Sequence, residues 1–121
     1  MEKENTLCSE TVRYEVRIVQ VSLDDLYAIY RYVALNDSPG KAEHLLDNIH
    51  KAMSSLETMP ARGNHPPEMQ RWGISDFREV FFKPYRIIYE IGEKTVFIQA
   101  VLDGRRNCED LLQQRLLGFN E

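Results

Sequence analysis

The sequence predicts a single α+β domain in which a helical hairpin covers one face of an antiparallel sheet, with a short helix at the C-terminal end. Three observations support this fold class: a stretch of alternating polarity near the N-terminus, two consecutive amphipathic helical patterns, and three adjacent strand patterns in the second half. The expected element order is β-α-α-β-β-β-α within one domain at residues 12–121. Residues 1–11 show no hydrophobic period and are expected to form a flexible leader.

The first strand and the first helix are expected to follow this leader directly. Apolar residues alternate with polar ones over residues 12–18, which is typical of a half-buried strand. Ser22 is then expected to begin a helix, with Asp25 three positions later completing a capping box. The apolar stripe of this helix consists of Leu26, Ile29, Tyr30 and Val33.

A second helix is expected after a short loop. Ser38 is a good N-cap, and Pro39 is tolerated at the first helical position, so this pair starts the helix. Its apolar stripe stops at Met59-Pro60. Because the connection between the two helices is short, they should form an antiparallel hairpin. Residues 60–76 contain three prolines and two glycines and are expected to be an irregular loop.

The second half of the chain predicts a sheet of consecutive strands. Three strands are expected at residues 77–82, 85–91 and 95–102. Lys83-Pro84 should turn the first into the second, and Gly92-Glu93 should form a type II′ hairpin turn because glycine comes first. Asp103-Gly104 ends the last strand. Asn107 is expected to cap the final helix, with Asp110 at the capping-box position.

Composition and charge exclude several classes of protein. With 15 Lys and Arg against 19 Asp and Glu the net charge is −4, which argues against binding nucleic acid through a general positive field. No apolar run approaches the roughly 18 residues of a membrane span, and a cytoplasmic location is expected. Cys8 and Cys108 have neither metal nor redox spacing, so no metal site and no cofactor are expected.

Several short segments in this order resemble the RelE/ParE superfamily of bacterial type II toxin–antitoxin toxins, over about residues 12–117. They are residues 25–33 of the first helix, 56–60 closing the second helix, Tyr85-Arg86-Ile87-Ile88-Tyr89, and the turn Asp103-Gly104-Arg105-Arg106. The resemblance implies a RelE/ParE-like fold and a toxin that inhibits growth until a cognate antitoxin neutralises it. RelE-like members cleave mRNA on the ribosome, whereas ParE-like members poison DNA gyrase.

The candidate site separates these two branches. Arg86 and Arg106 match the arginines that RelE-like nucleases place around the scissile phosphate, a role that suits the planar guanidinium. Glu79 and Phe81 stand where the nuclease lysines would align, and Leu111-Leu112 lies in the region of the nuclease tyrosine. The resemblance therefore favours the ParE-like branch, which needs no cleavage chemistry. Enzymatic activity is left uncertain, with Arg86 and Arg106 as the candidates.

The working hypothesis is a ParE-like toxin that binds DNA gyrase through the 103–106 turn and the C-terminal helix. The residues expected to contact the target or the antitoxin are Arg86, Arg105, Arg106, Leu112 and Phe119. The antitoxin should be a flexible segment that folds onto the toxin as a helix. Two alternatives are a ribosome-dependent mRNA endoribonuclease and a non-toxic member that only binds its antitoxin. A homodimer or a toxin–antitoxin hetero-oligomer is left open, and a salt bridge to Glu79 or Asp103 is an alternative role for Arg86.

Overall fold

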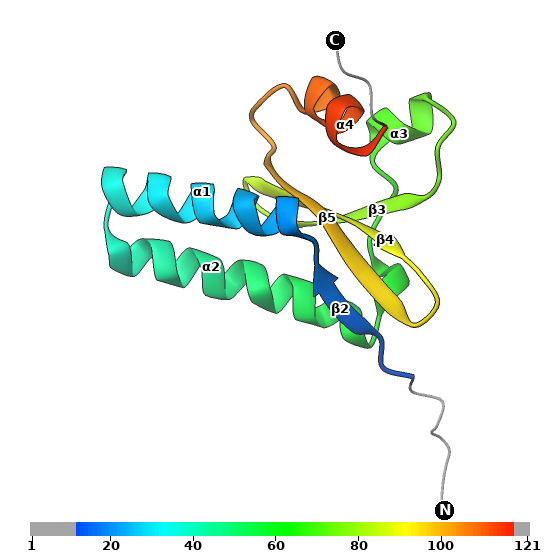
Figure 1. The fold of residues 1–121 in the computed structure, drawn as a ribbon, viewed down its shortest axis with the longest axis horizontal. Helices are drawn as coiled ribbons and strands as arrows, with labels where there is room; N and C mark the ends of the chain where they lie inside the picture. The colour runs from blue at the N-terminus through cyan, green and yellow to red at the C-terminus, as the bar shows by residue number, and fades with distance from the viewer. Residues whose placement is uncertain (1–11, 118–121) are drawn as a thin grey trace, which may run out of the picture.

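The computed structural model describes residues 12–117 and confirms the α+β class and the expected element order (Figure 1). Within those residues, no helix is long and apolar enough to cross a membrane. The elements are β2 (Glu15–Ile18), α1 (Gln20–Asn36), α2 (Pro39–Ser54), η1 (Ser55–Glu57), η2 (Pro60–Arg62), α3 (Pro67–Arg71), β3 (Phe77–Phe82), β4 (Tyr85–Ile91), β5 (Thr95–Asp103) and α4 (Cys108–Leu116).

The sheet has four strands in the order β2-β5-β4-β3. The pairs β3–β4 and β4–β5 are antiparallel, as expected for hairpin-connected strands. The edge strand β2 pairs in parallel with β5, so the expectation of a wholly antiparallel sheet is wrong at this strand. Alternating polarity indicates which face of a strand is buried, but it carries no information about the neighbour or its direction.

The start of α1 also differs from the expectation. The helix begins at Gln20 with Val19 as its N-cap, and no side chain caps it. Ser22 instead donates its hydroxyl to the Ile98 carbonyl oxygen at 3.0 Å, and a carboxylate oxygen of Asp25 accepts from the Val101 amide at 3.0 Å. The predicted capping box is therefore wrong. Both side chains satisfy backbone groups of β5, which buried strands require.

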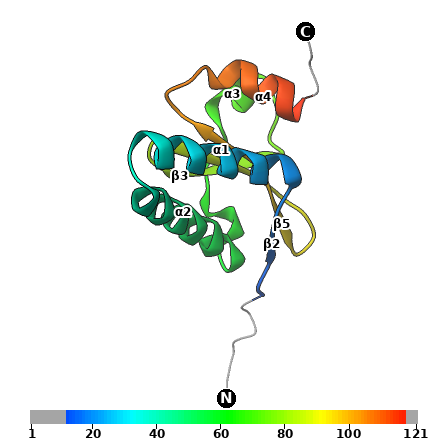
Figure 2. The same ribbon diagram turned by 60° about the vertical axis from the view of Figure 1, so that its left-hand side comes forward.

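The hairpin of α1 and α2 covers one face of the sheet (Figures 1 and 2). The Ser38 hydroxyl accepts from the Lys41 amide at 3.1 Å, so the predicted cap of α2 is confirmed. The buried residues of this first core are Leu26, Ile49, Met53, Leu56, Val80, Tyr85, Ile87, Tyr89, Val96, Ile98 and Val101. Apolar residues at helical spacing in the hairpin thus meet apolar residues at strand spacing in the sheet.

The opposite face of the sheet is covered by α3 and α4, which lie together beyond the sheet in both views (Figures 1 and 2). This second core consists of Met69, Ile88, Ala100, Leu102, Cys108 and Leu112. Part of the expected 60–76 loop is therefore helical. Asn107 caps α4 as predicted, because its side-chain oxygen accepts from the Asp110 amide at 3.4 Å.

The turn between β4 and β5 is longer than expected. The Gly92 amide donates to the Thr95 carbonyl oxygen at 2.6 Å, and the positive φ of 76° falls on Lys94 rather than on glycine. The predicted two-residue type II′ turn is therefore wrong. Further along, Ile88 pairs with Ala100 and Tyr89 with Ile98, which leaves Gln99 as an extra residue in β5. Such a bulge interrupts the alternation of faces along a strand.

Candidate functional site

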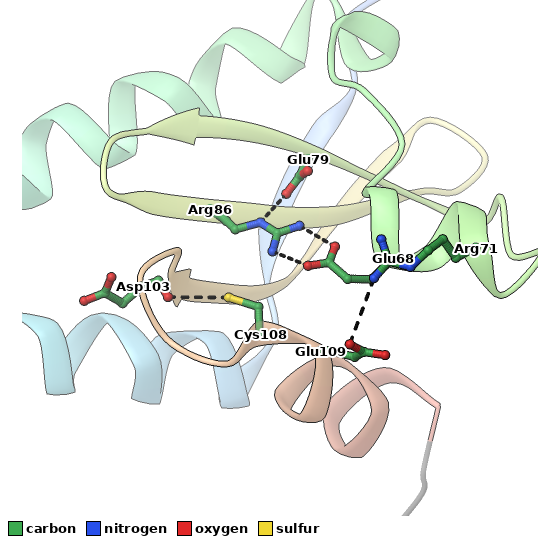
Figure 3. A network of polar contacts seen from close by, with 7 residues as sticks. All are labelled: Glu68, Arg71, Glu79, Arg86, Asp103, Cys108 and Glu109. Carbon is green, nitrogen blue, oxygen red and sulfur yellow. Dashed lines mark hydrogen bonds and ion pairs between the residues drawn. The ribbon is translucent and has the colours of Figure 1, made fainter.

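The side chain of Arg86 is enclosed by two carboxylates beneath α3 (Figure 3). Its Nε donates to Glu79 Oε1 at 2.7 Å, while Nη1 and Nη2 donate to the two oxygens of Glu68 at 2.8 Å each. Arg86 is 8% exposed and Glu79 is 3% exposed. The salt bridge to Glu79 considered as an alternative role for Arg86 is therefore present, with Glu68 as a second partner.

Local structure explains how these three residues meet. Arg86 of β4 lies opposite Phe81 of β3, so Glu79 is its diagonal neighbour on the same face of the sheet. Glu68 stands in the first turn of α3, which packs over that face. The bidentate pair with Glu68 uses the planar fork of the guanidinium, the strongest geometry available to an arginine–carboxylate pair.

The electrostatics of this triad oppose phosphate binding. Two carboxylates face one guanidinium, which leaves an excess of one negative charge. The hydrogen bonds from Arg86 hold the pKa of Glu68 below its ordinary value of 4.5, although burial opposes this. The hydrogen bond to Glu68 likewise raises the pKa of Arg86, so Glu68 and Arg86 both stay ionised near neutral pH. An incoming phosphate would have to displace a carboxylate from a buried arginine.

The 103–106 turn lies next to this triad and carries the two other predicted arginines. The Arg105 guanidinium donates to Asp103 through Nε at 2.9 Å and Nη2 at 2.8 Å, and the pair lowers the pKa of Asp103. The Gly104 amide donates to the Pro84 carbonyl oxygen at 2.7 Å, and a Cβ at this position would lie 2.9 Å from that oxygen. A larger residue at 104 would therefore displace the turn.

Arg106 differs from its neighbour because its guanidinium forms no salt bridge or hydrogen bond to residues 12–117. It lines a pocket of about 430 Å³ between α1 and the turn. The pocket is lined by Ala28, Ile29, Tyr32, Tyr85, Asp103 and Arg106. With Asp103 neutralised by Arg105, Arg106 is the uncompensated charge among these lining residues.

Tyr85 adds a buried phenol to this pocket. The residue is 7% exposed, and no hydrogen bond joins its hydroxyl to any of residues 12–117. Burial, followed by the nearby Asp103 charge, raises the pKa of Tyr85 above 10.0, so the hydroxyl keeps its proton at neutral pH. The sequence does not reveal that Tyr85 faces a pocket, because an aromatic residue on a strand has the same pattern in a core and beside a pocket.

The helix α4 is attached to the rest of the molecule by polar contacts as well as by its core residues. Arg115 donates to both carboxylate oxygens of Asp25 at 3.1 and 3.0 Å and to the Gln99 carbonyl oxygen at 3.2 Å. The Cys108 thiol lies 3.4 Å from the Asp103 carbonyl oxygen, and Arg71 reaches Glu109 at 4.0 Å (Figure 3). These contacts fix α4 beside the turn.

The predicted contact residues thus fall into different environments. Arg105 and Arg106 are exposed on the turn, as a contact role requires. Leu112 is 0% exposed in the second core, so its side chain is not accessible to a partner in this arrangement. Arg86 is buried under α3, away from solvent. Phe119 lies outside the described residues. Within residues 12–117, no group of three His, Cys, Asp or Glu side chains could hold a metal ion.

Comparison with known proteins identifies the family. A family model described as the ParE toxin of the type II toxin–antitoxin system parDE matches residues 16–108. A search of curated proteins finds no match. The fold resembles that of a solved structure titled as a chromosomal ParDE toxin–antitoxin system from P. aeruginosa, with a TM-score of 0.62 at 18% identity over 74% of this chain and 94% of that chain. The chain therefore belongs to the ParE toxin family of type II toxin–antitoxin systems.

Proposed function

We propose that the chain stops bacterial growth by binding DNA gyrase, and that a cognate antitoxin holds it inactive until the antitoxin is lost. Membership of the ParE family supports the general role. The preference for gyrase over the ribosome rests on the chemistry of the candidate site, because one fold serves both branches of the superfamily.

The enclosure of Arg86 is the observation that carries this preference. Cleavage of RNA by its own 2′-hydroxyl needs a base, an acid and fixed positive charge around the phosphate. At Arg86 the positive charge is already taken by Glu68 and Glu79, and the triad as a whole is negative. The neighbouring Phe81 of β3 offers no group that transfers a proton. A function by protein contact requires none of this chemistry.

Inducing the chain in cells without its antitoxin tests the proposal. We expect filamentous cells with an SOS response, together with inhibition of supercoiling when the purified chain is added to gyrase in vitro. Rapid translation arrest with cut mRNA would contradict the gyrase proposal and favour the endoribonuclease. Normal growth would contradict both toxic activities and leave a member that only binds antitoxin.

A matched pair of arginine variants tests whether the turn is the contact surface. Arg106→Ala should abolish toxicity, whereas Arg62→Ala, which removes another exposed arginine outside this pocket, should remain toxic. The thermal unfolding of both variants should match the wild type because both side chains are exposed. Full toxicity of a folded Arg106→Ala variant would rule out the turn as the site.

A further inference from the structure

The pocket beside the 103–106 turn continues into an unusual surface of α1. Val21, Ala28, Tyr32 and Leu35 are spaced by seven, four and three residues, so they lie along one side of the helix. This stripe is solvent-exposed in the described molecule, and Tyr32 and Leu35 are 66% and 77% exposed. Tyr32 also lines the pocket, so the stripe and the pocket form one continuous surface.

We propose that this surface binds the cognate antitoxin through an anchor of defined chemistry: one Asp or Glu side chain enters the pocket, and neighbouring apolar side chains of the same segment lie on the α1 stripe. The inference rests on the proposed function, since it assigns the residues that recognise the antitoxin. Charge complementarity selects the occupant. Arg106 forms no salt bridge within residues 12–117, and its acidic neighbour Asp103 is already paired with Arg105.

Tyr85 points independently to a polar ligand. Its side chain lines the pocket, and its hydroxyl forms no hydrogen bond within residues 12–117, so the hydroxyl can donate to a ligand there. A carboxylate in the pocket would accept a hydrogen bond from the Tyr85 hydroxyl and form an ion pair with Arg106. Both donors line the same hollow of about 430 Å³, which is large enough for a carboxylate side chain.

The balance of charge favours a carboxylate over a phosphate group. The pocket holds one uncompensated positive charge, because Arg105 already neutralises Asp103. A singly charged carboxylate matches that charge, whereas a phosphate group with more negative charge would meet the Asp103 carboxylate as a further repulsive neighbour. The apolar stripe leads to the same choice. An amphipathic peptide supplies both apolar side chains and a carboxylate, and α1 offers a surface suited to such a helix.

Affinity measurements with the full chain test this inference. The probe is the purified protein encoded by the reading frame that adjoins the gene, titrated by calorimetry. Arg106→Gln should weaken binding about 10- to 100-fold, the range of a charge-assisted hydrogen bond. Tyr85→Phe, which removes only the hydroxyl, should weaken it about 3- to 10-fold. Arg62→Gln is the matched control and should bind like the wild type, because that arginine lies outside the pocket.

A double-mutant cycle identifies the anchoring carboxylate. Each Asp and Glu of the probe is replaced singly by Asn or Gln. One replacement should weaken binding to the wild type about tenfold but have less than a twofold effect on Arg106→Gln. If every replacement has the same effect on both chains, the anchor is absent and the inference is overturned.

The outcomes separate this inference from the proposed function. If the probe binds the wild type, and binds Arg106→Gln and Tyr85→Phe equally well, the pocket inference fails while antitoxin binding stands. If the probe does not bind the wild type, the antitoxin role itself is contradicted and the inference falls with it. Side-chain NMR of Arg106 provides a further test: a shift caused by inorganic phosphate at lower concentration than by acetate would overturn the choice of a carboxylate.

Discussion

Arg86 and Arg106 lie close together in the fold but differ in burial and in their charged partners. A Cβ at Gly104, two residues before Arg106, would lie 3.4 Å from Arg86 Cγ. Arg86 is nevertheless buried and surrounded by Glu79 and Glu68, while Arg106 is exposed beside a pocket. The comparison teaches that position relative to the sheet decides the role of an arginine: one stabilises the packing of α3, and the other is available to a partner.

The largest expected effect on stability comes from removing the buried arginine, Arg86. Arg86→Met should lower the free energy of unfolding by about 3–5 kcal/mol, because it leaves Glu79 and Glu68 as uncompensated buried carboxylates. Urea denaturation measures this loss. A triple variant with Arg86→Met, Glu79→Gln and Glu68→Gln should recover most of it. A loss below about 1 kcal/mol in the single variant would show that the triad is not structurally important.

A variant of Leu112 tests whether this residue of α4 serves to pack the second core or to bind a partner. Leu112→Ala should cost about 2–5 kcal/mol because the side chain is fully buried between α4 and the sheet. At concentrations where the variant is folded, its affinity for the antitoxin should equal that of the wild type. Near-normal stability combined with weaker antitoxin binding would restore Leu112 to the contact surface.

A smaller effect should follow from Glu68. The glutamate has a pKa below its ordinary value of 4.5 in the folded state, so it contributes stability above that pH and loses the contribution as the pH falls through the folded pKa. Glu68→Gln should cost about 1–2 kcal/mol at pH 7. The difference from the wild type should shrink between pH 5 and pH 2 in denaturation experiments. Glu93→Gln, at an exposed position, is the control and should match the stability of the wild type at pH 7.

The sequence predicted the elements well because their signals are local. The Ser38-Pro39 start of α2 and the Asn107 cap of α4 depend on residues within one turn, and both are confirmed. The parallel pairing of β2 was not predictable because it depends on the far end of the chain. Asp25 shows the same limit: it resembles a capping residue locally, but it serves Val101 and Arg115 instead.

The sequence predicted which arginines belong to the candidate site, but not which residues surround them. Arg105 and Arg106 were correctly placed on an exposed turn. Glu68 was overlooked as a partner of Arg86 because it lies in a segment that shows no periodic pattern, where a pairing through space leaves no sequence signal. The pocket at Tyr85 was missed for a related reason, since three separate segments build it.

The smallest change in stability is expected on the exposed side of the comparison, at Arg105. Arg105→Gln should unfold at the wild-type temperature, because the side chain is exposed and its pair with Asp103 is screened by solvent. The variant should nevertheless bind antitoxin more weakly, since the released Asp103 carboxylate would pair with Arg106 and neutralise the charge of the pocket. The double variant Asp103→Asn, Arg105→Gln should regain the lost affinity. If the single variant binds antitoxin like the wild type, Arg106 does not act through its free charge. Arg106 would then differ from Arg86 only in being exposed.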